Sequence, residues 1–313
     1  MVNGVKSAFA SSLFIESMDK HYKSAKLEAE SRIKDYFATN QQLHSKHPML
    51  QHKHVKKELE RCMLSVHGGE YVLISFDIEA WERNTENVLE IGMSIYDPRN
   101  QQGCLMPTFK NIHIMVEEYT KCSNGRFVPD RHAQFMAVDT IVMNLENIRY
   151  FIQGILEYYH ELPSLNIGLV GHSIGGDLDW LKKLGIEMPP ASIIDTHTIF
   201  QYSRMKNQLT NLSSALLKVD TPHGYLHNAG NDAYFTLILA FKLLDPKIRS
   251  LHQLDVWKPD EIWDTRSKRQ RENEKANIIP ISNPEKAVKL YMNSVFGDKL
   301  NGSKDGESSK RAR

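Results

Sequence analysis

The chain has 313 residues, 41% of them hydrophobic and 25% charged, which is the composition of an ordinary globular protein with a substantial core. Its 39 basic and 38 acidic side chains give a net charge of +1, so the overall charge indicates no nucleic-acid partner. The three cysteines, Cys62, Cys104 and Cys122, contain no CxxC pair, which argues against a disulfide framework and a zinc ribbon. No apolar run approaches the about 18 residues that a membrane span needs, so no membrane partner is expected.

Residues 1–68 are expected to form a polar, partly helical extension, with an exposed helix over Ser17–Phe37. Four histidines follow that helix within eleven positions, and their spacing matches no common zinc ligand set: His44, His47, His52 and His54. We therefore expect a solvated basic segment here. The N-terminus also lacks the Arg-rich pattern of a transit peptide, which favours the cytoplasm or nucleus and leaves a mitochondrial address as the less favoured option.

Residues 69–246 are expected to form the main domain, in which strands and helices alternate after a strand-rich start. Apolar runs predict strands at Tyr71–Asp77, Val88–Tyr96, Thr108–Val116, Asn166–Gly171 and Ala191–Asp195. Helical spacing of apolar residues predicts helices at Val138–Tyr159, Gly176–Leu184, Leu209–Leu217 and His227–Leu244. This order predicts an α/β fold with a mixed five-stranded sheet flanked by helices. Residues 247–313 are expected to be a charged C-terminal extension with one helix at Pro284–Phe296 and a disordered tail.

Four carboxylates fall at the ends or starts of these predicted elements. Asp77 and Glu79 close the first strand, where residues two apart share one face. Asp177 follows the fourth strand, and Asp232 lies early in the last helix. Two carboxylates on one face of an apolar strand are costly without a positive partner, and a divalent metal ion is the natural counter-charge. Hard divalent cations prefer oxygen ligands, and two of them can bind both the attacking and the leaving oxygen of a displacement.

His227 is the candidate proton acceptor, because a neutral imidazole has its pKa near working pH. On a helix, His227 and Asp232 are five residues apart and therefore offset by about 140° around the axis. Both side chains are thus expected to border one cleft. Each carboxylate on its own is a weak indication, since most acidic residues are solvated or cap a helix. Together, in this order and in these elements, they indicate a metal-dependent site.

The motifs around these residues resemble the His-containing DEDDh branch of the DEDD exonuclease superfamily. FDIE at 76–79 is similar to its first motif, and EIG at 90–92 is similar to the sequence that follows it. HSIGGDL at 172–178 resembles the second motif, with serine where asparagine is commoner, and HNAGNDA at 227–233 resembles the third. More narrowly, these stretches resemble a fungal DEDDh-like family that includes a protein supporting the DEAD-box helicase of mRNA export. The match spans about residues 70–245.

The resemblance implies a ribonuclease H-like fold and a 3′–5′ exonuclease that releases 5′-mononucleotides from single-stranded nucleic acid. It implies that two Mg²⁺ or Mn²⁺ ions are held by Asp77, Glu79, Asp177 and Asp232, with His227 as general base. RNA is favoured over DNA, although no residue that recognises the 2′-hydroxyl is identified. RNA-processing or mRNA-export factors are the expected partners, and the sequence does not give the oligomeric state.

Three further residues are candidates for substrate contacts: Trp81, Arg126 and His172. Trp81 follows Glu79 in an interval that is longer and more polar than is usual in the superfamily, and it can stack on a terminal base. Arg126 lies in a loop-like segment and can touch a phosphate. The alternatives are burial of Trp81 against the sheet and a solvated loop around Arg126.

Two other functions compete with the nuclease. Residues 171–175, GHSIG, match the GxSxG elbow of α/β-hydrolases, with Ser173 as nucleophile and Asp195 and His227 in the required order. A serine esterase, however, leaves Asp77 and Glu79 unexplained, and a five-residue motif has a high false-positive rate. The second alternative is a non-catalytic, RNA-associated binding module on the same fold, because fold does not fix function.

Overall fold

The computed structural model describes residues 12–101, 104–137, 139–203 and 211–257, together with residues 285 and 288, and their side chains from residue 23 onward. The chain separates into two compact units, Met1–Asp260 and Glu261–Arg313. The architecture below is that of the first unit. The predicted helix at 284–296 lies, apart from residues 285 and 288, outside the described residues, as does the predicted tail.

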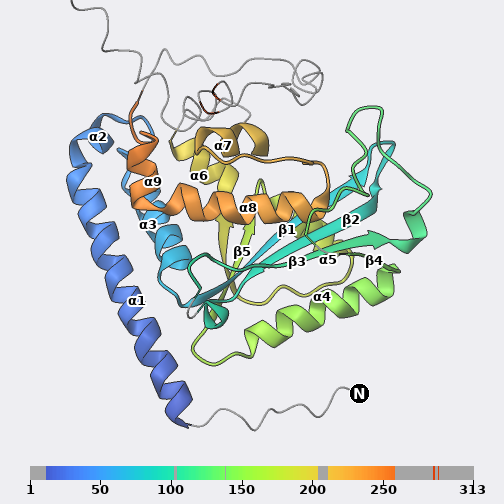
Figure 1. The fold of residues 1–313 in the computed structure, drawn as a ribbon, viewed down its shortest axis with the longest axis horizontal. Coiled ribbons are helices and arrows are strands. Elements are labelled where there is room, and N and C mark those ends of the chain that lie inside the picture. Colours follow the sequence, from blue (N-terminus) through green and yellow to red (C-terminus); the bar gives the residue numbers. More distant parts are fainter. Residues whose placement is uncertain are drawn as a thin grey trace, which may run out of the picture. The chain divides into compact units, whose positions relative to one another are not determined.

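A mixed sheet forms the centre of this unit (Figure 1). Its strands are β1 Tyr71–Trp81, β2 Asn84–Tyr96, β3 Lys110–Val116, β4 Thr140–Met143, β5 Asn166–Gly171 and β6 Ala191–Asp195. They lie in the order β4-β3-β2-β1-β5-β6. The β1–β2 and β2–β3 pairs are antiparallel, whereas β3–β4, β1–β5 and β5–β6 are parallel. The predicted α/β class with a mixed sheet is therefore confirmed.

The sheet has six strands rather than the five predicted. The additional strand β4 occupies Thr140–Met143, where a helix starting at Val138 was expected. Three of its four residues, Thr140, Ile141 and Val142, are β-branched and favour extended backbone. The following helix begins only at Leu145, because the Asn144 side chain caps it by accepting the backbone N–H of Asn147 at 2.9 Å.

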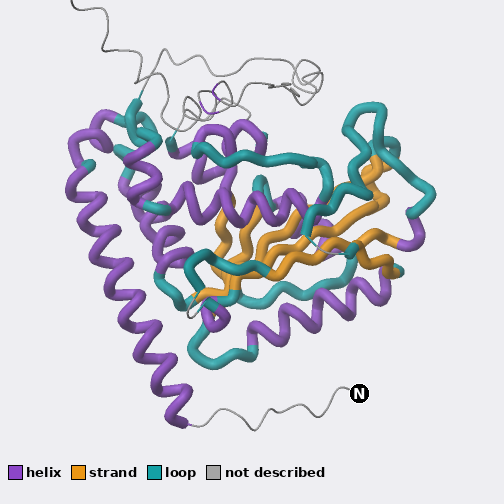
Figure 2. Tube along the Cα trace, viewed as in Figure 1, coloured by secondary structure: helices purple, strands orange, loops and turns teal. Residues whose placement is uncertain are grey.

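Helices cover both faces of the sheet (Figure 2). In chain order they are α1 Ser12–Thr39, α2 Gln41–Lys46, α3 Lys53–His67, α4 Leu145–His160, α5 Gly175–Lys183, α6 Thr196–Tyr202, α7 Leu212–Lys218, α8 Ala229–Leu244 and α9 Pro246–Leu251. Helix α8 crosses one face and packs on β1 and β2, while α4 lies along the other face (Figure 1). Among the described residues, no helix is both long and apolar enough to cross a bilayer.

Side-chain alternation along β1 divides the interior into two parts. Val72, Ile74 and Phe76 are fully buried and belong to one apolar cluster with Ile148 and Ile152 of α4. Burying such side chains contributes about 1.5–3 kcal/mol each, so this face supplies much of the stabilisation. The odd-numbered residues of the strand, which include Asp77 and Glu79, point to the opposite face. The candidate carboxylates therefore lie on the side of the sheet that α8 covers.

The N-terminal segment holds buried polar residues, contrary to the solvated segment that we expected. His44 and His47 are both fully buried. Nε2 of His44 donates to Oδ2 of Asp255 at 2.9 Å, and Arg249, also fully buried, pairs with Oδ1 of Asp255 at 2.5 Å. Burial lowers the pKa of His44 to about 4, so this imidazole is neutral at pH 7. The partners come from about 200 residues further along the chain, which local sequence patterns do not reveal.

Candidate active site

The first pair of carboxylates is held by the sheet. Asp77 and Glu79 lie on β1 opposite Gly92 and Glu90 of β2, in consecutive rows on the face that α8 covers. The strand does not end at Asp77 as predicted but continues to Trp81. Both side chains are half-buried. Their backbone positions are therefore fixed by the pairing of β1 with β2.

His227 lies just before helix α8 rather than on it, which corrects the predicted start of that helix. The helix begins at Ala229 because the Asn228 side chain caps it by accepting the backbone N–H of Asn231 at 3.1 Å. His227 has a φ of 70°, in the left-handed region, and its N–H donates to Oδ2 of Asp232 at 3.1 Å. This turn directs the imidazole to the carboxylates, with Nδ1 4.0 Å from Oε1 of Glu79.

One group of candidate metal ligands stands out among the described residues. Ligand atoms of Glu79, His227 and Asp232 lie within 4.8 Å of one another. The sequence placed all three in one site, and the structure brings them together from β1, the turn before α8 and α8 itself. Asp77 and Asp177 lie outside this group of three, but Asp77 interacts electrostatically with Glu79 and Asp232 of the group and with Asp177.

Asp177 reaches the site from helix α5. Its Oδ1 accepts the backbone N–H of Ile78 at 3.0 Å, which places its carboxylate between the positions of Asp77 and Glu79 along β1. Asp179, two residues further on, is exposed. The structure therefore brings Asp177 to the first motif, as the sequence spacing indicated.

The carboxylates impose a large unfavourable charge on one another. Burial, and then the charges of Asp232, Glu79 and Asp177, raise the pKa of Asp77 well above its ordinary value. Burial also raises the pKa of Asp177 to about 7, and burial followed by the charge of Glu79 raises the pKa of Asp232. Oδ1 of Asp232 is buried and has no hydrogen-bond partner among the described residues. An unsatisfied carboxylate oxygen inside a cluster of carboxylates is the donor set that a hard divalent cation fits.

A buried network, which the sequence did not reveal, holds the turn that carries His227. Oε2 of Glu90 accepts hydrogen bonds from Nε2 of His113 at 2.8 Å and from the N–H of Ala229 at 3.3 Å. The amide Nδ2 of Asn228 lies 3.4 Å from the same oxygen and donates to the carbonyl of Arg131 at 3.1 Å. Glu90 was recognised only as part of the EIG motif. The buried carboxylate beside the first turn of α8 explains why a glutamate stands there.

Two glycines let α8 approach the sheet closely enough to deliver its residues. A Cβ on Gly92 would lie 1.8 Å from the carbonyl oxygen of Ala229, and a Cβ on Gly230 would lie 2.6 Å from the ring of Phe135. Neither position has room for a side chain. Asp77 pairs with Gly92 across the sheet, so this contact also sets the depth of Asp232 relative to Asp77.

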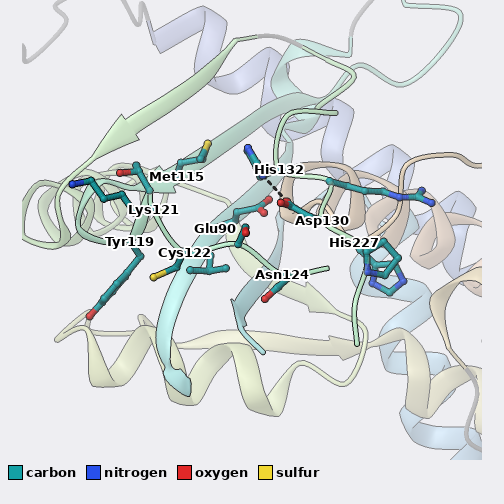
Figure 3. Close-up of a pocket in the computed structure, with 14 residues that line it drawn as sticks. Glu90, Met115, Tyr119, Lys121, Cys122, Asn124, Asp130, His132 and His227 are labelled. Atoms are coloured by element: carbon teal, nitrogen blue, oxygen red, sulfur yellow. Dashed lines mark hydrogen bonds and ion pairs between the residues drawn. The ribbon is translucent and has the colours of Figure 1, made fainter. Parts of the chain in front are cut away.

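A pocket of about 160 Å³ opens beside His227 (Figure 3). Its walls are Leu89 and Glu90 of β2, Met115 of β3, and residues 119–124 and 129–132. None of the three predicted substrate contacts lines this pocket. Trp81 is half-exposed beyond it, with Nε1 donating to the carbonyl of Ser123 at 3.2 Å, and Arg126 is exposed nearby on the same segment. His172 lies elsewhere, with Nδ1 3.0 Å from Oγ1 of Thr196.

Ser173 has the backbone strain of a nucleophile elbow, with a φ of 68°, but lacks the accompanying triad. Oδ1 of Asp195 accepts the N–H groups of Ser173 and His197 at 2.8 and 3.0 Å, and Oδ2 accepts the hydroxyl of Thr198 at 2.9 Å. This carboxylate therefore holds backbone, whereas His227 lies beside Glu79 and Asp232. The geometry argues against the esterase.

Comparison with known proteins gives related sequences in fungi. "Good for full DBP5 activity protein 2" of Saccharomyces cerevisiae is 30% identical over 255 residues, which cover 72% of this chain and 44% of the relative. An uncharacterized protein of the same yeast is 32% identical over 249 residues, covering 69% and 50%. An uncharacterized nucleolar protein of Schizosaccharomyces pombe is 27% identical over 168 residues, covering 51% and 63%. The chain thus spans about half the length of the first two relatives.

A solved structure of exonuclease I matches with a TM-score of 0.36 and 12% identity, over 58% of this chain and 43% of that one. A family model matches residues 72–243, which is more than half of the 313 residues and includes every motif described above. The predicted membership of the DEDDh superfamily and the resemblance to the fungal proteins are confirmed. The chain belongs to the DEDDh family described as "DNA polymerase III subunit epsilon-like, C-terminal domain".

Proposed function

We propose that this chain is a metal-dependent 3′–5′ exonuclease that hydrolyses single-stranded nucleic acid and releases 5′-mononucleotides. One observation carries the proposal: ligand atoms of Glu79, His227 and Asp232 converge within 4.8 Å, while a buried oxygen of Asp232 has no hydrogen-bond partner among the described residues. Asp77 and Asp177 add two more carboxylates, whose pKa values are raised first of all by burial. A purely structural role does not account for four carboxylates in this arrangement.

The residues have distinct roles in this proposal. Asp77, Glu79, Asp177 and Asp232 would hold the divalent ions, two Mg²⁺ or Mn²⁺, because these carboxylates supply hard oxygen ligands. Such ions, when bound, lower the pKa of the attacking water and stabilise charge on the phosphate. His227 would accept the proton of that water through its imidazole, which the left-handed turn and its N–H bond to Asp232 hold beside Glu79.

RNA is the favoured substrate, in a setting of RNA processing or mRNA export. The likeness to the yeast protein supports this setting, since that relative is named for the full activity of DBP5. Factors of that machinery are the partners that we propose, and the cytoplasm or nucleus is the compartment. The pocket beside His227 supplies hydrogen-bonding groups near the carboxylates, as a site for a terminal nucleotide requires.

The test is turnover of single strands labelled at the 3′ or the 5′ end, as RNA and as DNA, with Mg²⁺, Mn²⁺ or EDTA. Asp177→Asn is the inactive variant, and Asp179→Asn is its matched control, because the exposed Asp179 is on the same helix turn. We expect metal-dependent release of mononucleotides from the 3′ end by the wild type and by Asp179→Asn, with loss of at least ~100-fold in Asp177→Asn.

The alternative functions make different predictions in the same assay. A non-catalytic binding module retains the labelled strand without cleaving it under any metal. A serine esterase hydrolyses a small ester and loses that activity in Ser173→Ala. Equal nuclease activity in wild type and Asp177→Asn would refute the assignment of the metal site.

A further inference from the structure

The tip of the β1–β2 hairpin is joined to the loop at residues 123–128, about 45 positions further along the chain. Nδ2 of Asn124 donates to the carbonyl of Ala80 at 3.1 Å, and Oδ1 of Asn124 accepts the N–H of Glu82 at 2.8 Å. The carboxylate of Glu82 in turn accepts the backbone N–H groups of residues 126, 127 and 128, the shortest at 2.7 Å. The two segments therefore form one built surface rather than two independent loops.

This surface carries two pairs of a cation and an aromatic ring. The guanidinium of Arg83 lies 6.0 Å from the ring centroid of Trp81, and that of Arg126 lies 5.0 Å from the ring centroid of Phe127. Phe127 is 61% exposed although it is a large apolar side chain. We call Trp81, Arg83, Arg126 and Phe127 the hairpin platform.

The charges of the hairpin platform favour an anionic ligand. Neither Arg83 nor Arg126 forms an ion pair with the described residues. The acidic residue next to Arg83, Glu82, accepts hydrogen bonds from backbone N–H groups, which lower its pKa. Glu86, further along the hairpin, lies 3.5 Å from Lys183. The guanidinium groups of Arg83 and Arg126 are thus available to bind an anionic ligand.

The hairpin platform is continuous with the candidate active site. Trp81 follows Glu79 by two residues on β1, which is about 7 Å along a strand. The pairing of β1 with β2 shifts register on both sides of Ala80, and such irregularities re-aim side chains beside active sites. The segment that carries Arg126 and Phe127 also contributes residues 119–124 and 129–132 to the walls of the pocket beside His227. A strand whose 3′ end lies at the carboxylates therefore has a direct path onto this surface.

We propose that the hairpin platform binds the single-stranded segment that leads into the active site, with bases stacked on Trp81 and Phe127 and phosphates held by Arg83 and Arg126. This inference rests on the proposed exonuclease function and specifies its substrate as an unpaired strand several nucleotides long. Stacking on aromatic rings tolerates any base, so the surface selects for single strands rather than for a sequence. A duplex presents no free base faces and is a poor ligand for it.

The proposal is tested by fluorescence anisotropy with a labelled, unpaired homopolymer of about 15 nucleotides, as RNA and as DNA, in EDTA so that no cleavage occurs. Phe127→Ala is expected to weaken binding on the order of tenfold, and Phe127→Trp to retain it, because the ring is what stacks. Arg126→Ala should reduce the magnitude of the slope of log affinity against log salt concentration by about one, because one phosphate contact is lost. Phe127→Ala should leave that slope unchanged.

The matched control is the Arg149–Tyr150 pair on α4. Its guanidinium lies 4.7 Å from the ring, and Tyr150 is 60% exposed, but α4 covers the other face of the sheet. Tyr150→Ala should bind the strand as the wild type does. Equal affinity of the wild type, Phe127→Ala and Arg126→Ala, or equally tight binding of a duplex, would overturn the proposal. Strand binding that depends on these residues, without any turnover, would refute the exonuclease function and support the hairpin platform. Turnover that none of these variants affects would support the exonuclease function and refute the hairpin platform.

Discussion

Replacing Asp177 by asparagine should stabilise the metal-free protein at neutral and alkaline pH. Asparagine keeps an oxygen to accept the N–H of Ile78, so the hydrogen bond that places this side chain is retained. It removes, however, a charge whose burial raises the pKa of Asp177 to about 7. The substitution therefore separates the electrostatic cost of the carboxylate from its packing.

The magnitude follows from the difference between a folded pKa of about 7 and an ordinary value of 3.8. A raised pKa means that the folded state binds the proton of Asp177 more tightly than the unfolded state does. The stability that this protonated carboxyl contributes is therefore fully present below about pH 4 and is lost as pH rises through about 7. At 1.36 kcal/mol per pH unit, the wild type loses about 2 kcal/mol of stability by about pH 5 and about 4 kcal/mol by about pH 8, relative to its stability at low pH. Asp177→Asn avoids this cost.

The assay is urea unfolding in EDTA at those two pH values, with Asp179→Asn as control because that carboxylate is exposed. The free energy of unfolding of Asp177→Asn should exceed that of the wild type, and the difference should be larger at the higher pH. In a thermal melt the substitution should raise Tm by several degrees, at about 2–4 °C per kcal/mol. Mg²⁺ or Mn²⁺ should stabilise the wild type more than the variant, since a bound cation offsets the same charge. A variant that is destabilised equally at both pH values would refute this reasoning, because the effect would then come from packing.

Three further predictions concern the residues around this site and the fold that supports it. His227→Ala should lower kcat by about 10²–10⁴-fold while metal binding, measured by calorimetry, largely persists; loss of metal binding would make the imidazole a ligand instead. Gly92→Ala should destabilise the protein by more than about 3 kcal/mol in urea unfolding, since its Cβ would meet the carbonyl of Ala229, and wild-type stability would contradict that close approach. Arg249→Ala should cost about 3–5 kcal/mol because it leaves the buried carboxylate of Asp255 without its cationic partner; a loss under ~1 kcal/mol would show that the buried pair is dispensable.

The secondary structure was predicted most accurately where a local sequence pattern is compatible with only one kind of element. Asn166–Gly171 and Ala191–Asp195 are strands with the predicted bounds, because short apolar runs between polar residues have few alternatives. The carboxylates were found because their order and spacing match three separate motifs. Asp77, Glu79 and Asp232 converge only after β1 and α8 pack together, yet the motif order already implied that packing.

What the sequence did not reveal depends on contacts between distant segments. Glu90 and His113 are 23 residues apart, and each lies within an ordinary strand pattern, so their hydrogen bond has no local signature. His44 likewise is recognisable as a buried residue only with its partner Asp255, 211 positions away. One local indication was available for His227: Asn228 is a favoured helix cap, and a cap there places the preceding residue outside the helix.

The turn at residues 171–175 shows why a short motif is compatible with two chemistries. Both an esterase elbow and this site need a strand to turn abruptly into a helix, so both use a small residue in left-handed backbone, here Ser173 with a φ of 68°. The backbone alone does not discriminate between them. The feature that distinguishes an esterase from a metal site is the set of groups that Asp195 and Asp177 contact. Asp195 accepts the N–H of Ser173, whereas Asp177, which follows the same turn, accepts the N–H of Ile78 and adds its charge to those that raise the pKa of Asp77. The turn thus serves to deliver Asp177 rather than to present Ser173.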